Sequence, residues 1–153
     1  MRIDKTKDER FKVMMRDFVR TYSNRAATTE DFKAIIEKHM TLEMDLHGNG
    51  TMDWFFDEYV YGTALPQYKL DYSFARNAGG ELILNIRIEQ SNVDENFVMQ
   101  VPIYLEFNGA IRRLGNVVLR GNKTVAQSVS LAKLSEKPKR VLLNYYFDVL
   151  CTQ

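Results

Sequence analysis

The segment from Asp45 to Glu58 (DLHGNGTMDWFFDE) holds the densest group of side chains that could bind a metal. Aligned with a calcium-binding loop, it supplies oxygen-bearing side chains at four of the expected positions, from Asp45, Asn49, Thr51 and Asp53. The twelfth position requires a carboxylate that binds through both oxygens, and Phe56 stands there. His47 offers a nitrogen to an ion that prefers oxygen. The sequence therefore predicts a polar loop, turned by glycines, and no calcium site.

The remaining side chains suited to catalysis do not form a known constellation. His39 and His47 are too far apart for a zinc helix, which places two histidines at i and i+4 around a catalytic Glu. His39 falls on an apolar helical stripe, so we expect a core histidine whose nitrogens are satisfied. Cys151 lies in an apolar run and is predicted to be a small buried hydrophobe. No catalytic, cofactor-binding or metal-binding residue is predicted.

Composition narrows the classes of partner. The chain has 153 residues, of which 45% are hydrophobic and 27% charged, and its net charge is +1. These values are ordinary for a globular protein, and the near-zero charge argues against a nucleic-acid partner. No apolar run has the length of a membrane span. The compartment is left open.

The sequence predicts two kinds of secondary structure, and the first is helical. Three segments place apolar residues on a 3.6-residue period, which predicts three amphipathic helices. The stripes are Phe11, Met14, Met15, Phe18, Val19 and Tyr22, then Phe32, Ile35, Ile36, His39 and Met40, then Met52, Phe55, Phe56, Tyr59 and Val60. Thr28 is expected to cap the second helix with Asp31 three residues later. Gly62 is expected to end the third helix in the left-handed conformation.

After Pro66 the apolar period changes to two, which predicts strands. Six strands are expected, around Tyr68–Phe74, Leu82–Ile88, Phe97–Phe107, Ile111–Arg120, Thr124–Leu131 and Arg140–Leu150. Pro102 predicts an edge strand or a bulge, and Asn108-Gly109 a two-residue hairpin. The pattern predicts an α+β fold, with about three helices at residues 1–65 and an antiparallel, Ig-like β-sandwich at residues 66–153.

Three motifs carry a family resemblance: Thr28–Phe32 (TTEDF), Asp53–Pro66 (DWFFDEYVYGTALP) and Tyr68–Tyr72 (YKLDY). Together they resemble the C-terminal part of M1-family zinc aminopeptidases. In that family a TxEDF helix precedes a helix ending in FFxxWVxGTGxP, and a β-sandwich then begins with YxLxY. The likeness extends in outline to Val141–Asn144. Two positions depart from the family pattern, since Tyr59 replaces its tryptophan and Ala64 its second glycine.

The resemblance implies a parent enzyme that removes N-terminal residues from peptides. In the family, zinc is held by a His-Glu-x-x-His motif and a distant Glu, all upstream of the region matched here. The chain would thus be a non-catalytic C-terminal fragment with a structural role, made of the last helices of the catalytic domain and the following sandwich. It would need no cofactor itself, while the parent would bind zinc. Its partner would be the rest of the parent, which alone would meet the peptide substrate.

A second hypothesis stays open, in which the chain is a stand-alone Ig-like module that binds a protein or a carbohydrate. That module would carry an exposed aromatic patch on its sandwich. The fragment would instead expose an apolar face on its helices, which is also a candidate dimer surface. For the fragment, Tyr59, Tyr61 and Tyr68 are expected to be mostly buried around the joint between the third helix and the first strand.

Overall fold

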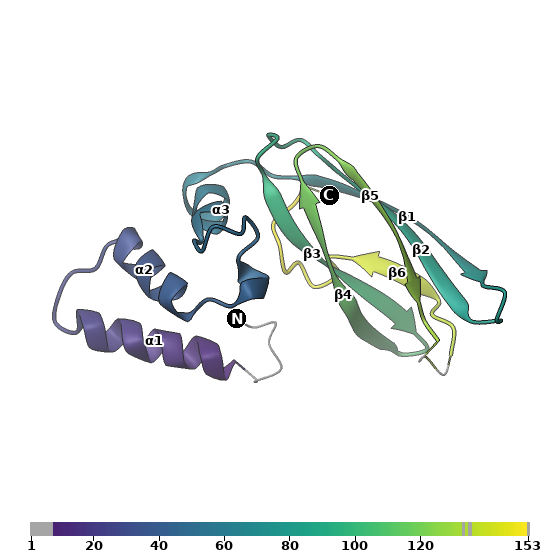
Figure 1. Cartoon of the computed structure of the whole chain (residues 1–153), viewed down its shortest axis with the longest axis horizontal. Coiled ribbons are helices and arrows are strands. Elements are labelled where there is room, and N and C mark those ends of the chain that lie inside the picture. Colours follow the sequence, from purple (N-terminus) through teal and green to yellow (C-terminus); the bar gives the residue numbers. More distant parts are fainter. Residues whose placement is uncertain (1–7, 133, 135, 153) are drawn as a thin grey trace. The chain divides into compact units, whose positions relative to one another are not determined.

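The computed structural model describes residues 8–132, 134 and 136–152. The chain divides into two compact units, Met1–Thr63 and Ala64–Gln153. The helices belong to the first unit and the strands to the second, and all strand pairs are antiparallel (Figure 1). The α+β class predicted from the change of period is confirmed, with three α-helices and six strands among the described residues.

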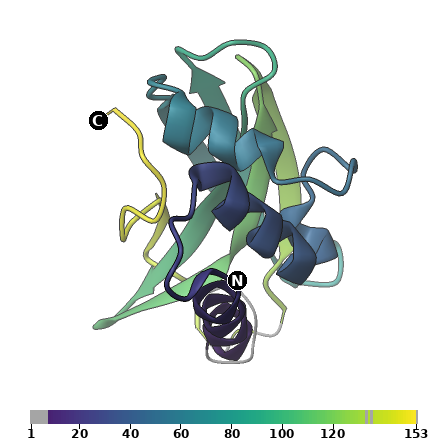
Figure 2. The same ribbon diagram turned by 90° about the vertical axis from the view of Figure 1, so that its left-hand side faces the viewer.

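The helical unit contains α1 (Glu9–Tyr22), α2 (Thr29–His39), the 3₁₀ turn η1 (Leu42–Met44), α3 (Asp53–Phe56) and the π-helical turn η2 (Asp57–Tyr61). Figure 2 shows α1 nearly end-on, with α2 running across it. The third predicted helix is therefore one α-helical turn that widens into a π turn. The predicted cap of α2 is confirmed: Thr28 Oγ1 accepts from the Asp31 amide at 3.1 Å, and the Thr28 amide donates to Asp31 Oδ2 at 2.9 Å.

A small apolar core joins the three helices. Its buried members are Met14, Ile35, Ile36, Met52 and Phe56. The predicted stripe of α1 is only partly inward, because Met14 is 1% exposed whereas Val19 is 62% exposed. At 100° per residue these two side chains are about 140° apart around the helix, and α2 covers the side that carries Met14. The apolar stripe of α1 therefore has a buried side and an exposed side.

The strands form two three-stranded sheets. One has the order β1-β2-β5, with β1 at Gln67–Arg76, β2 at Leu82–Ser91 and β5 at Thr124–Ser130. The other has the order β4-β3-β6, with β4 at Ala110–Arg120, β3 at Val98–Phe107 and β6 at Arg140–Leu143. The predicted alternation is confirmed on β2, where Leu84, Ile86 and Ile88 are buried. On β3 the residues predicted to point inward, Val101, Ile103, Leu105 and Phe107, are buried, but Pro102 and Tyr104 between them are buried too, so burial does not alternate there. These residues make the larger core of the molecule.

Two strand predictions need correction. The last strand ends at Leu143 and not at Leu150, because Asn144 and Phe147 take left-handed backbone angles (φ 49° and 54°) that break the extended chain. Pro102 does not lie on an edge, since β3 is the central strand of its sheet. The alternative of a bulge is confirmed one residue further on, where the register with β4 shifts between Ile103 and Tyr104. The predicted Asn108-Gly109 hairpin joins β3 and β4.

Candidate functional site

The end of the third helix, Trp54–Gly62, carries the motif on which the family resemblance depends. Trp54 Nε1 donates a hydrogen bond to the Met44 carbonyl at 2.9 Å, which fixes the indole against η1. The Phe55 ring stacks on Tyr59, with centroids 5.0 Å apart and planes 21° apart, and meets Trp54 edge-on at 5.7 Å. Trp54, Phe55 and Tyr59 therefore form one packed row along the helix end.

Gly62 ends the π turn, but not in the predicted way. Its φ is −80°, so the left-handed conformation expected from the sequence is wrong. A Cβ built at Gly62 would lie 2.5 Å from the Asp57 carbonyl oxygen and 2.9 Å from that of Glu58. Backbone atoms cannot move aside as a flexible side chain would. Glycine is required here because the wide turn brings its own carbonyls against the exit residue.

Tyr61 is not mostly buried, contrary to the expectation from the sequence. Its side chain is 56% exposed, and its hydroxyl donates to Glu30 Oε1 at 2.5 Å. This hydrogen bond raises the pKa of the Tyr61 hydroxyl above its usual value. Tyr59 and Tyr68 are half-buried. Tyr61 thus links the end of η2 to the start of α2 from the surface of the helical unit.

The loop at residues 45–53 uses its oxygens to hold its own shape. Asp45 Oδ1 and Oδ2 accept from the amides of Asn49 and Gly50, each at 3.0 Å. The Asp53 carboxylate binds Lys33 Nζ and, at 2.6 Å, the Thr51 hydroxyl. The ammonium of Lys33 lowers the pKa of Asp53. Among the described residues there is no group of three or more His, Cys, Asp and Glu placed to hold a metal ion.

His39 joins two helices from the edge of the helical unit. Its Nε2 lies 2.7 Å from Asp17 Oδ2, the same oxygen that accepts from Lys38 Nζ at 2.9 Å. The prediction of a satisfied nitrogen is confirmed for Nε2, but the side chain is 19% exposed and is not part of the core. Hydrogen bonds from Lys38 and His39 lower the pKa of Asp17. The group is a clamp between α1 and α2.

In the sheet unit, the segment that follows β6 folds into a loop over β3. Asn144 fixes it at both ends, since its Nδ2 donates to the Val149 carbonyl at 2.8 Å and its Oδ1 accepts from the Val149 amide at 3.1 Å. The Tyr104 hydroxyl is hydrogen-bonded to Asp148, and the Tyr146 ring meets Tyr104 edge-on at 5.2 Å. Burial, and then the Asp148 bond, raise the pKa of Tyr104 to about 12.

This loop creates an apolar groove that strand periodicity did not reveal. The groove has a volume of about 730 Å³. It is lined by Tyr68, Leu70, Leu143, Asn144, Tyr145, Tyr146, Phe147, Cys151 and Thr152. Tyr146 and Phe147 are 60% and 68% exposed. Cys151, predicted to be buried, is half-buried at its wall.

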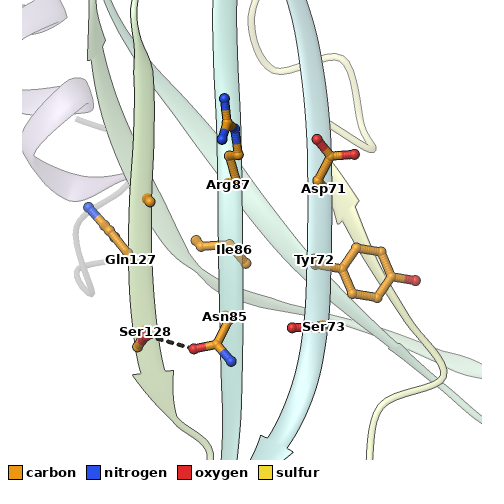
Figure 3. Close-up of a pocket in the computed structure, with 9 residues that line it drawn as sticks. Asp71, Tyr72, Ser73, Asn85, Ile86, Arg87, Gln127 and Ser128 are labelled. Atoms are coloured by element: carbon orange, nitrogen blue, oxygen red, sulfur yellow. Dashed lines mark hydrogen bonds between the residues drawn. The ribbon is translucent and has the colours of Figure 1, made fainter.

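A shallower concavity of about 480 Å³ lies on the sheet β1-β2-β5 (Figure 3). Its polar side chains come in cross-strand rows, with Asp71 beside Arg87, and Ser73 beside Asn85. Ser128 of β5 extends the second row and donates to Asn85 Oδ1 at 2.7 Å. Acidic, basic and neutral polar side chains are mixed here, which is typical of the solvated face of an antiparallel sheet.

The comparisons with known proteins identify no relative that would help to interpret these features. No family model, curated protein or solved structure matches the chain. Among the described helices, none has the length and apolar character needed to cross a membrane. Functional inference therefore depends on the residues themselves.

Proposed function

We propose that the chain is the non-catalytic C-terminal part of an M1-family zinc aminopeptidase. It would supply the last helices of the catalytic domain and an Ig-like sandwich with a structural role. The parent would hydrolyse N-terminal residues from peptides, with zinc bound by residues upstream of this chain. The contacts of the helical unit support that division, because the carboxylates of Asp17, Asp45 and Asp53 and the imidazole of His39 hold turns and helices together.

The observation that carries the proposal is that the helix-exit motif has glycine at a position where the backbone leaves no room for a side chain. The motif resembles the family pattern FFxxWVxGTGxP, and its first glycine is Gly62. In the structure that position tolerates no side chain, since a Cβ would lie 2.5 Å from a backbone oxygen. The aromatic positions of the motif, Phe55 and Tyr59, stack on each other. A residue pattern that matches a family at sterically demanding positions is stronger support than a match at exposed ones.

The helical unit also has the character of an incomplete domain. Phe11, Val13 and Val19 of α1 are 39%, 47% and 62% exposed, and Leu42 in η1 is 90% exposed. Helices of a globular protein normally turn such side chains toward a neighbour. In the proposed parent, preceding helices of the catalytic domain would cover them.

The strand order supports the Ig-like part of the proposal. In Ig domains, strands A, B and E share one sheet, and strands C and F lie side by side in the other. The orders β1-β2-β5 and β4-β3-β6 correspond to A-B-E and C′-C-F. The central strand β2 buries alternate residues on one face, as a sandwich requires.

The test is the reading frame that encodes the chain. We expect a His-Glu-x-x-His motif upstream of residue 1 in the same frame. A complete frame without that motif would overturn the proposal. At the protein level, the purified 153-residue chain should hydrolyse no aminoacyl-p-nitroanilide and retain no stoichiometric zinc after dialysis. Zinc-dependent hydrolysis by the isolated chain would contradict the non-catalytic role.

The groove at the end of the sheet unit favours a second function, a stand-alone Ig-like module that binds a protein or a carbohydrate. Its exposed aromatic side chains are of the kind that binding sites use. A glycan array probed with the chain tests the carbohydrate form of this idea. Binding that Tyr146→Ser abolishes and Tyr72→Ser retains would favour it, since Tyr72 is an exposed aromatic of the same unit outside the groove.

A further inference from the structure

Strand β5 is an edge strand without the usual protection against pairing. It forms hydrogen bonds with β2 on one side, and no described strand pairs with its other side. Its sequence, Thr124–Ser130 (TVAQSVS), contains no charged residue, proline or glycine. Five of the seven residues are exposed. An exposed edge of this kind is a template for a further strand.

The other three edges are protected. On β1 the edge begins with Gln67, which bridges Thr152, and the strand carries charges at Lys69 and Asp71. On β4 there are three arginines and a register shift. The last edge, β6, has only four residues. Charges, irregularities and short length are the devices by which edges avoid association. Their absence from β5 alone marks it as the edge on which pairing is favoured.

We propose that β5 pairs antiparallel with β5 of a second copy of this chain, about a twofold axis at Gln127. The argument for this partner is that the strand matches itself. Antiparallel pairing centred on Gln127 places Thr124 opposite Ser130, Val125 opposite Val129, and Ala126 opposite Ser128. Each pair joins residues of similar size and chemistry, and no pair joins two charges. A symmetric dimer requires such a self-complementary surface.

Pairing about this axis would also bring together side chains that lie on the same face of the sheet. Val125, Gln127 and Val129 are in register with the buried residues Ile88, Ile86 and Leu84 of β2, so they share one face. Each valine would meet a valine on the core side of the joined sheet. Figure 3 shows the Gln127 side chain pointing away from β2. At the axis, each Gln127 amide can donate to the other, as side-chain amides do when they face one another.

The predicted dimer is weak and depends on concentration. Seven strand residues span about 24 Å at 3.4 Å each. An interface of this length is in the range of small, transient contacts, so we expect a dissociation constant on the order of 10 to 100 µM. This association involves the sheet unit alone and does not depend on the proposed peptidase parent.

The experiment is sedimentation velocity of the full chain over a concentration series from about 1 to 500 µM, which brackets the expected dissociation constant. Wild type should shift from monomer to dimer. Gln127→Lys and Gln127→Glu each place like charges at the axis, so each alone should weaken dimerisation at least tenfold. Mixing the two variants should restore a dimer with one copy of each. Ser73→Lys, the same change of charge at an exposed position of β1, should dimerise like wild type.

Three sedimentation results would overturn the proposal. Wild type could stay monomeric throughout the series, or Gln127→Lys could dimerise unchanged. Dimerisation could instead be lost in Val19→Lys, on the exposed side of α1, and kept in Gln127→Lys, which would assign the contact to the helices. Hydrogen exchange of the wild type is an independent check. The β5 amides should exchange more slowly as concentration rises, and an unchanged rate in a sample shown to be dimeric would exclude pairing at β5.

Discussion

The helical unit and the sheet unit are stabilised in different ways. Five hydrophobic residues are buried in the described part of the helical unit, and sixteen in that of the sheet unit. The helical unit adds several polar contacts to its small core. Asp17 joins Lys38 and His39, Asp53 joins Lys33, and Asp31 closes the cap of α2. Short helices with a small shared core gain little from burial, so charge and capping carry a larger share of their stability.

The largest effect should come from the centre of the smaller core. Phe56→Ala removes a ring that is 2% exposed and should destabilise the helical unit by about 4 kcal/mol. Trp54 is the only tryptophan, so urea unfolding followed by its fluorescence reports on this unit. The control Leu42→Ala removes a side chain that is 90% exposed in the same unit and should change stability by less than about 0.5 kcal/mol. Equal effects of the two variants would show that the small core is not packed.

A smaller effect is expected at the helix exit. Gly62→Ala forces a Cβ against the Asp57 carbonyl and should cost about 2 kcal/mol in the same assay. Gly115→Ala is the matched control, because a Cβ there meets no atom within 4 Å and the backbone is not left-handed. Because Gly115 lies in the sheet unit, its stability is followed by the β-sheet signal in circular dichroism. If Gly62→Ala proves as stable as Gly115→Ala, the steric reason given for this glycine is wrong.

The capping box should contribute less again. Thr28→Ala removes the acceptor for the Asp31 amide and should cost about 1 kcal/mol of helical-unit stability. Thr29→Ala changes the neighbouring exposed residue, whose side chain takes no part in the box, and should be nearly neutral. Thermal unfolding by far-UV circular dichroism can compare them. Equal melting temperatures for the two variants would remove the cap from this account.

The smallest individual effects should appear as acid sensitivity. The pKa values of Asp17, Asp31 and Asp53 are lowered in the folded state by their hydrogen-bond partners. Carboxylates with lowered pKa values contribute stability above their unfolded pKa, and that stability is lost as pH falls through the folded pKa. Below about pH 4, the ordinary range for Asp, the helical unit should therefore weaken before the sheet unit. Trp54 fluorescence and the β-sheet signal in circular dichroism, followed during acid titration, should separate in that order.

Much of the fold was predictable because local chemistry and tertiary structure agree. The box of Thr28 and Asp31, the alternation on β2 and the Asn108-Gly109 hairpin are all local signals that the structure keeps. The errors arise where a non-local contact overrides the local pattern. The apolar run of Arg140–Leu150 predicts a strand, but Asn144 and Tyr104 draw its second half into a loop.

The candidate sites were less predictable for the same reason. A groove lined by β1 and the segment after β6 joins residues far apart in the sequence, such as Tyr68 and Tyr146. The free edge of β5 depends on strand order, which periodicity does not specify. The sequence predicted that the third helix ends at Gly62. The steric reason for a glycine there is the π turn before it, and a single-residue pattern does not predict a π turn.

Peptide-resolved amide hydrogen exchange of the full chain tests most directly whether the helices are the remnant of a larger domain and the sheets a self-sufficient one. Amides of α1, α2 and α3 should exchange at least tenfold faster than those of β2 and β3 after correction for intrinsic rates, a difference of about 1.4 kcal/mol in opening free energy. Equal protection in the two units would contradict the account, because it would show that the small helical core is complete without further helices.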